Sequence, residues 1–288
     1  MKLSEETAME PETSFARLYE DRFGLAPDFP APAEMNPVLA GILARRSHRR
    51  FRADPVAPDL LRTLLACAQS APAKSDLQQY AIVVIRDAAL RLRMNELLSS
   101  QPWVEGAPVM LVLCGDLRRG QRVTALRGLT HANNNMDSFM NAAVDAALTM
   151  QTFILAAEAA GLGCCPLSVI RNRIEEVSTA LSLPDGVFPV AGLCVGWPAA
   201  KGFTTLRLPP AIVVHEDRYD DSDLETELAA YDARRHKRFP ITPDKQLHAE
   251  HYGQAETYHW SHNAARRLSR PERAGFRDFL LKHGFKLA

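Results

Sequence analysis

The basic run RRSHRRFR, from Arg45 to Arg52, holds the residues of this sequence best suited to bind an anion. It places five arginines, a serine and a histidine in eight positions, whereas the whole chain balances 34 Lys and Arg against 34 Asp and Glu. An arginine fork binds phosphate oxygens in bidentate fashion. A local positive charge on a neutral chain favours a small anionic ligand and disfavours a general nucleic-acid binder, which needs a broad basic surface.

The sequence lacks the glycine motifs that usually hold nucleotide phosphates. Neither G-x-G-x-x-G after an expected strand nor G-x-x-x-x-G-K-[ST] is present. A bound nucleotide would therefore depend on side chains to hold its phosphate. The run R-R-S-x-R, just after an expected helix, can supply two or three guanidiniums and a hydroxyl to one ligand.

The apolar periodicity around the basic run predicts a mixed α+β domain. The spacing and breakers predict helices over 36–46, 57–72, 137–161, 223–235 and 272–285, and strands over 80–87, 107–116, 187–198 and 211–215. Regular structure is expected to begin near Pro37. Few strands alternate loosely with helices, so we expect a sheet buried inside a helical shell.

The segment 137–161 gives the strongest helical signal. Apolar residues recur with 3-then-4 spacing, and Gly161 and Gly163 end the pattern; they are Phe139, Met140, Ala143, Ala147, Met150, Phe153, Ile154 and Ala157. Its charged and polar residues argue against a membrane span. We expect a central core helix whose alanine-rich faces can also form a subunit interface.

The N-terminus and the cysteines indicate a cytoplasmic protein. The stretch MKLSEETAMEPETS has no apolar core, so no signal peptide is expected. The five cysteines are an odd number, and four of them lie in apolar surroundings. We expect buried, reduced thiols, including the neighbours Cys164 and Cys165, because a disulfide between adjacent residues is strained.

Four segments in order resemble the nitroreductase family of FMN-dependent enzymes: RRSHRRF, SAPAKSDLQQYAIVVI, AAEAAGLGCCPLSVIRN and LPDGVFPVAGLCVGWP. The stretch GLCVGWPA…LRLPPAIVVHE is similar to the NADPH-preferring, oxygen-insensitive nitroreductase and flavin reductase branch. The likeness covers about residues 36–235. It implies a homodimer with a mainly antiparallel sheet enclosed by helices and FMN between the subunits. It also implies ping-pong hydride transfer through flavin N5, from NADPH or NADH to small flat aromatic acceptors.

The resemblance assigns roles to the basic run. Arg45 or Arg46, with Ser47, would hold the FMN phosphate or ribityl tail, and Arg49 would lie near the N1–O2 edge.

Three segments are expected along the chain. Residues 1–35 are acidic and then rich in proline and alanine, which predicts an N-terminal arm. An FMN-binding domain (36–240) and a C-terminal helical extension packing on that domain (241–288) would follow.

Two further segments match the family with changes. Pro72, Ala73, Lys74 and Asp76 occupy a loop usually written P-S-S-x-N-x-Q, in which two hydroxyls have become Ala73 and Lys74. Lys74 can compensate by facing the flavin or its phosphate. Gln101 in SSQPWV matches a glutamine that contacts the flavin pyrimidine.

The remaining matches concern flavin N5 and the phosphate. The resemblance places Pro166 against the ring and a backbone N–H among Leu167, Ser168 and Val169 at N5, and it implies no acid–base catalytic residue. Arg207 keeps the second cation of a K-x-R pair, whereas Thr205 replaces the first. Lys201 or Arg45 could supply the missing charge.

Several alternatives stay open. The late histidines His236, His248, His251, His259 and His262 could form a zinc site, although no metal is expected. The chain could be a non-catalytic FMN carrier or sensor, or a specialised flavin-degrading or dehalogenating member. NADPH preference would need cations near the 2′-phosphate, for which the candidates are Arg234, Arg235, Lys237 and Arg238.

Overall fold

The computed structural model describes residues 14–288 of the 288-residue chain. Most of the N-terminal stretch for which no signal peptide is expected therefore lies outside the described residues. The described chain forms two compact units. The sheet unit comprises Arg46–Gly202 and Arg273–Ala288, and the helical unit comprises the residues up to Arg45 together with Phe203–Glu272. The expected division near residues 35 and 240 stays a prediction.

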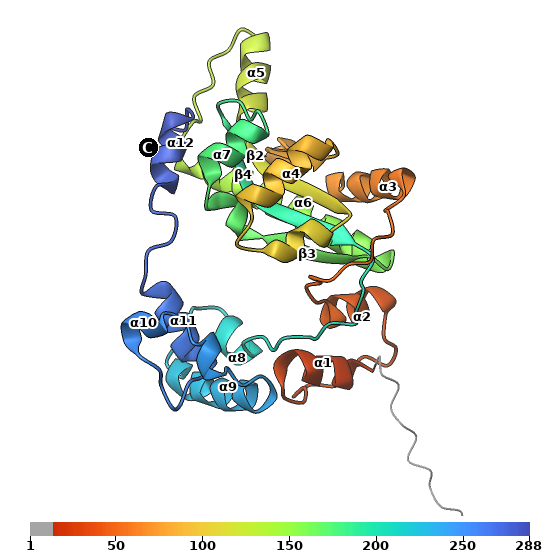
Figure 1. The fold of residues 1–288 in the computed structure, drawn as a ribbon, viewed down its shortest axis with the longest axis vertical. Coiled ribbons are helices and arrows are strands. Elements are labelled where there is room, and N and C mark those ends of the chain that lie inside the picture. Colours follow the sequence, from red (N-terminus) through yellow and green to blue (C-terminus); the bar gives the residue numbers. More distant parts are fainter. Residues whose placement is uncertain (1–13) are drawn as a thin grey trace, which may run out of the picture. The chain divides into compact units, whose positions relative to one another are not determined.

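The sheet unit is built on a four-stranded antiparallel sheet (Figure 1). The strands are β1 (Tyr80–Ile85), β2 (Val109–Asp116), β3 (Gly163–Leu167) and β4 (Val187–Gly196), in the order β1-β2-β4-β3. Every residue of β2 is buried. Its side chains alternate between the faces: Leu111 and Leu113 join one apolar core, whereas Met110, Val112 and Cys114 join another.

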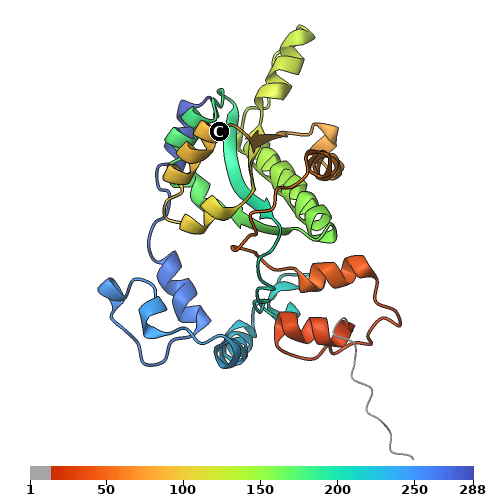
Figure 2. The same ribbon diagram turned by 45° about the vertical axis from the view of Figure 1, so that its right-hand side comes forward.

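Helices cover both faces of this sheet and complete its α+β architecture. The helices of the unit are α3 (Pro58–Gln69), α4 (Ala88–Leu97), α5 (Arg118–Leu126), α6 (Met136–Ala159), α7 (Ile174–Ala180) and α12 (Phe276–Lys282), with 3-10 turns η1 (Lys74–Asp76), η2 (Pro102–Gly106) and η3 (Ser168–Arg171). The first core is shared with α3 and α6, and the second with α4 and α7. In Figure 2 the long yellow-green helix α6 runs along one face of the sheet.

Helix α6 confirms the strongest helical prediction. Its buried residues include Ala142, Asp145 and Thr149, whereas Met140 is 54% exposed. Small alanines occur all round the helix, so the periodicity could not fix its rotation. Within residues 14–288, α6 is the one helix long and apolar enough to cross a membrane, by length and composition only. Its packing on α3 and all four strands agrees with a core helix.

The helical unit contains α1 (Phe15–Phe23), α2 (Pro37–Ala44), α8 (Pro210–Val213), α9 (Leu224–Arg238), η4 (Pro243–Lys245), α10 (Ala249–Tyr252) and α11 (Trp260–Leu268). Two of the predictions fail here. Helix α1, capped by the Ser14 hydroxyl, precedes Pro37. The expected strand 211–215 is mostly the short helix α8, which starts at a proline and packs against α9, leaving Val213 and Val214 exposed.

Strand β3 was not predicted because its sequence, GCCPL, contains a glycine and a proline. It lies at the edge of the sheet, where Pro166 pairs with Leu193 of β4. An edge position tolerates proline because the missing N–H need not serve a second neighbour.

Candidate functional site

The basic run continues from α2 as an extended segment beside β3 and the end of β4. Ser47 forms a parallel bridge with Cys164, and the His48 N–H donates to the Cys164 carbonyl at 3.0 Å. Further on, the Arg52 N–H donates to the Trp197 carbonyl at 2.8 Å. Backbone pairing at Ser47, His48 and Arg52 therefore holds the basic run along the edge of the sheet.

Gly163 makes this close approach possible. A Cβ at this position would come within 2.7 Å of the His48 ring, closer than real Cβ contacts. Nearby, the Arg46 guanidinium donates to the Lys201 carbonyl at 3.3 Å, which brings the chain of Lys201 beside Arg46. One of the two substitutes expected for the cation lost at Thr205 thus lies next to the basic run.

Strand β3 leads directly into the segment expected at flavin N5. Cys165 and Leu167 are buried, whereas Pro166 and Ser168 are exposed and Val169 is half-buried. The Ser168 hydroxyl accepts a bond from Arg273 at 3.4 Å, and Arg273 also donates to Asn172 at 2.9 Å. Pro166 and Ser168 are therefore accessible to a ligand next to the basic run.

Arg49 and Gln101 meet at an aromatic residue that the sequence analysis did not select. The Arg49 guanidinium lies 5.9 Å from the centre of the Trp103 ring, and the Trp103 indole N–H donates to Gln101 Oε1 at 2.8 Å. Because its oxygen accepts from the indole, Gln101 presents its amide N–H groups as donors. Trp103 was recognisable as an aromatic two residues beyond Gln101.

The loop between α3 and β1 contains Pro72, Ala73, Lys74 and Asp76. All but the half-buried Ala73 are exposed. The Lys74 ammonium donates within the loop to the Ser75 hydroxyl at 3.3 Å. Its backbone N–H donates to Asp145 of α6 at 2.9 Å, and the Gln79 N–H donates to the other oxygen of Asp145 at 2.9 Å.

In the helical unit, Arg45 and Arg207 are joined through Arg22, which is only 7% exposed. The Arg22 guanidinium donates to the carbonyls of Leu43, Thr205 and Arg45, at 2.7 Å to Leu43 and 3.3 Å to Thr205. The Arg207 N–H donates back to the Arg22 carbonyl at 2.8 Å. Arg22 stands in a segment expected to be an irregular arm, so no motif pointed to it.

Thr205 also contacts the retained cation directly. The Arg207 guanidinium donates to the Thr205 hydroxyl at 2.9 Å. The threonine hydroxyl therefore orients Arg207 without adding charge.

Three of the late histidines, His236, His259 and His262, lie close together in the helical unit. His259 and His262 cap α11 reciprocally, and the His236 ring lies 5.0 Å from that of His259. Residues 14–288 contain no group of three or more His, Cys, Asp or Glu side chains arranged to hold a metal.

Of the five cysteines, Cys67 is exposed and the other four are buried. Burial raises the pKa of Cys114 and of Cys194 to about 12. Since the thiolate is the reactive form, these two side chains act as core residues.

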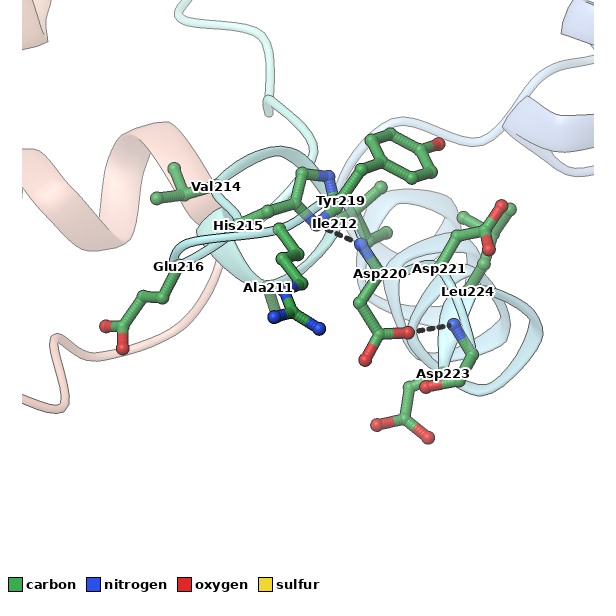
Figure 3. Close-up of a pocket in the computed structure, with 12 residues that line it drawn as sticks. Ala211, Ile212, Val214, His215, Glu216, Tyr219, Asp220, Asp221, Asp223 and Leu224 are labelled. Atoms are coloured by element: carbon green, nitrogen blue, oxygen red, sulfur yellow. Dashed lines mark hydrogen bonds between the residues drawn. The ribbon is translucent and has the colours of Figure 1, made fainter.

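The described part of the chain also forms two cavities. One, of about 350 Å³, is formed by 211–224 in the helical unit, where Asp220 accepts from the Ser222 N–H at 2.9 Å (Figure 3). The other, of about 540 Å³, lies beside β1 and α3. Both are lined by none of the residues that the sequence assigned to cofactor binding.

Comparison with known proteins matches most of the chain. The model of the nitroreductase family matches residues 42–197, and that of its C-terminal domain matches residues 206–288. An FMN reductase [NAD(P)H] of Bacillus subtilis is 32% identical over 258 residues, covering 88% of this chain and 99% of the relative. An oxygen-insensitive NADPH nitroreductase of Salmonella typhimurium is 33% identical over 255 residues, covering 87% and 99%.

Solved structures of this family are similar to the fold of this chain. NfrA2 of B. megaterium superposes with a TM-score of 0.79 at 30% identity, covering 88% of this chain and all of that one. The NADPH:FMN oxidoreductase of Vibrio harveyi, solved with NAD+, gives 0.75 at 26% identity over 86% and 98%. This chain belongs to the nitroreductase family.

Proposed function

We propose that this protein is an FMN-dependent NAD(P)H oxidoreductase that reduces nitroaromatics, quinones or flavins. The relatives named as FMN reductase and NADPH nitroreductase support this activity. The observation in this chain that carries the proposal is the meeting of Arg49 and Gln101 at Trp103. It gives a flavin pyrimidine both a cation and amide donors.

The residues present fit FMN by the chemistry of their donors. Arg49 and the N–H groups of Gln101 suit the carbonyl oxygens of the pyrimidine, and a cation there favours the anionic reduced ring. Arg45, Arg46, Ser47 and Arg207 suit the ribityl tail and the phosphate. When bound, FMN supplies the hydride chemistry, with NADPH or NADH as the donor.

The chain's own task is to bind and orient. We place Pro166 and Leu167 beside the ring and assign the N5 contact to a backbone N–H of Ser168 or Val169. Pro72, Ala73, Lys74 and Asp76 form a loop that meets the flavin. No side chain is assigned an acid or base step, because hydride transfer needs none and water can supply protons.

We propose that the protein acts as a homodimer with FMN at the subunit interface. Helix α6 exposes an apolar stripe at i, i+4 spacing, formed by Met136, Met140, Val144 and Leu148. A double substitution Met140→Glu/Val144→Glu should give a monomer by light scattering and lower flavin occupancy. Leu92→Glu, on an exposed position of α4, is the matched control and should stay dimeric.

We also propose a cytoplasmic location, which the expectation of reduced, mostly buried thiols supports. The choice between NADPH and NADH depends on cations for the 2′-phosphate, and the candidates for these lie in the helical unit. Among them, Arg238 is already paired with Asp21 at 2.6 Å, whereas Arg234 has buried guanidinium nitrogens without a hydrogen-bond partner.

An anaerobic absorbance experiment tests the proposal. The purified protein, loaded with FMN, should bleach on addition of NADPH or NADH, and the two rates rank the donors. Reoxidation by a nitroaromatic or quinone completes the cycle. Bound flavin that neither donor reduces would instead identify an FMN carrier or sensor.

A further inference from the structure

The loop from Lys74 to Gln79, which we call the clamped loop, has an unusual backbone. Ser75, Asp76 and Gln78 have φ values of 50°, 57° and 50°. This left-handed region suits glycine and is costly for residues with a Cβ. Three such residues in four positions persist only where the surroundings hold them, and such strain is typical of ligand-binding segments.

A single buried carboxylate holds the two ends of the clamped loop. Asp145 is 1% exposed. Its Oδ1 accepts the Lys74 N–H and its Oδ2 accepts the Gln79 N–H, each at 2.9 Å. The two amides flank all three left-handed residues, so the contact spans the strained segment.

Aspartate is chemically specific for this task. A carboxylate only accepts, so each oxygen can take one backbone N–H, whereas asparagine would turn an amide N–H toward one of them. Charge-assisted bonds of this kind also offset the cost of burying the carboxylate. The alanines Ala142 and Ala146 beside it on α6 are fully buried, so the clamp is built into the core.

A second contact fixes the outgoing end. Arg119 donates to the Gln78 carbonyl at 2.6 Å and to the Tyr80 carbonyl at 2.9 Å, and it pairs with Asp116 at 2.9 Å. This contact anchors the start of β1. The incoming end at Lys74 depends on Asp145.

We infer that Asp145 is a positioning residue that keeps the clamped loop in the strained conformation in which it meets FMN. The inference rests on the proposed function, which assigns Lys74 and Asp76 to the cofactor. Without the carboxylate, the left-handed residues relax and the loop leaves the cofactor.

The first test is Asp145→Asn in the full-length chain. In the apoprotein, hydrogen exchange at the Lys74 and Gln79 amides should accelerate at least tenfold, and in an FMN titration the Kd should rise at least tenfold. Asp137→Asn is the matched control, because Asp137 is an exposed carboxylate on the same helix, where it accepts from the Asn141 side chain at 2.9 Å. It should change neither measurement.

The second test is rescue. In Asp145→Asn/Ser75→Gly/Gln78→Gly, glycine adopts the left-handed conformation without steric cost, so most of the FMN affinity should return. A role of Asp145 in core stability alone would leave affinity low in this variant. If Asp145→Asn does not fold, this strain-relieved variant is measured against Asp137→Asn.

The outcomes separate the two proposals. Unchanged exchange in Asp145→Asn, or faster exchange with unchanged FMN affinity, overturns the positioning role and leaves the proposed function intact. A wild-type chain that binds no FMN overturns both.

Discussion

In the sheet unit, Arg49 and Gln101 are oriented by contact with the side chain of Trp103, whereas in the helical unit Arg45 and Arg207 are oriented through the backbone by the buried Arg22. The first arrangement positions groups suited to a flavin ring. The second positions cations suited to a phosphate. The comparison teaches that the residues proposed to bind FMN are supported differently in each unit, and mutation can remove each support separately.

The largest effect on FMN affinity is expected when two cations are removed from the sheet unit. Arg46→Ala/Arg49→Ala should weaken FMN binding at least a hundredfold, because each charge-assisted hydrogen bond contributes about 1.5 to 3 kcal/mol. Fluorescence titration of the apoprotein measures the Kd. If the double variant is purified with full occupancy by the yellow FMN, the basic run does not bind the cofactor.

The second prediction concerns the stability of the helical unit, which should fall when Arg22 is replaced. Arg22→Met leaves the carbonyls of Leu43 and Thr205 without this donor, so the free energy of unfolding should fall by about 2 to 4 kcal/mol. Urea denaturation measures it. Arg17→Met, on an exposed position of the same helix, should cost under about 0.5 kcal/mol. Equal values for the two variants would contradict the bridging role of Arg22.

A smaller effect is expected at Trp103. Trp103→Phe keeps a ring beneath Arg49 but loses the indole bond to Gln101, so the Kd for FMN should rise about fivefold, which corresponds to about 1 kcal/mol. Trp197→Phe is a close control. The Trp197 indole N–H donates to the Pro55 carbonyl, and the Arg52 guanidinium carbon lies 5.7 Å from the centre of the Trp197 ring. An increase of the same size in both would indicate a general packing effect.

The smallest expected effect is the low reactivity of the thiols buried in the core of the sheet unit. One thiol per chain, Cys67, should react with a thiol reagent at pH 8, and all five should react after unfolding. With the pKa of Cys114 and Cys194 raised to about 12, their thiolates are scarce at this pH and become abundant only as the pH rises towards 12. A second fast thiol in the native protein would mean that this core opens.

The sequence predicted the elements with clear periodicity and the residues that belong to recognisable motifs. Strands β1, β2 and β4 and helices α2, α3, α6, α9 and α12 follow from apolar spacing. Short elements were misread, since a run such as AIVVH suits either a strand or one turn of helix until its neighbours are known. The cofactor residues themselves stay predictions.

The supports of the site escaped prediction for a different reason. Arg22 and Asp145 act through contacts with residues distant in sequence, which apolar spacing does not reveal. Trp103 lies only two residues beyond Gln101, so the sequence offered a signal for it that was not used. Asp145 was visible only as one carboxylate in an apolar helix. A charge in such a helix indicates that it has a buried partner, but the sequence does not show which residue that partner is.

The most direct test of the two-support account compares FMN with riboflavin, which lacks the phosphate, in the variants Arg49→Ala and Arg207→Ala. We predict that Arg207→Ala raises the Kd for FMN at least tenfold and leaves that for riboflavin unchanged, whereas Arg49→Ala raises both by the same factor. Equal losses of FMN and riboflavin affinity in Arg207→Ala would contradict the assignment of the phosphate to Arg207.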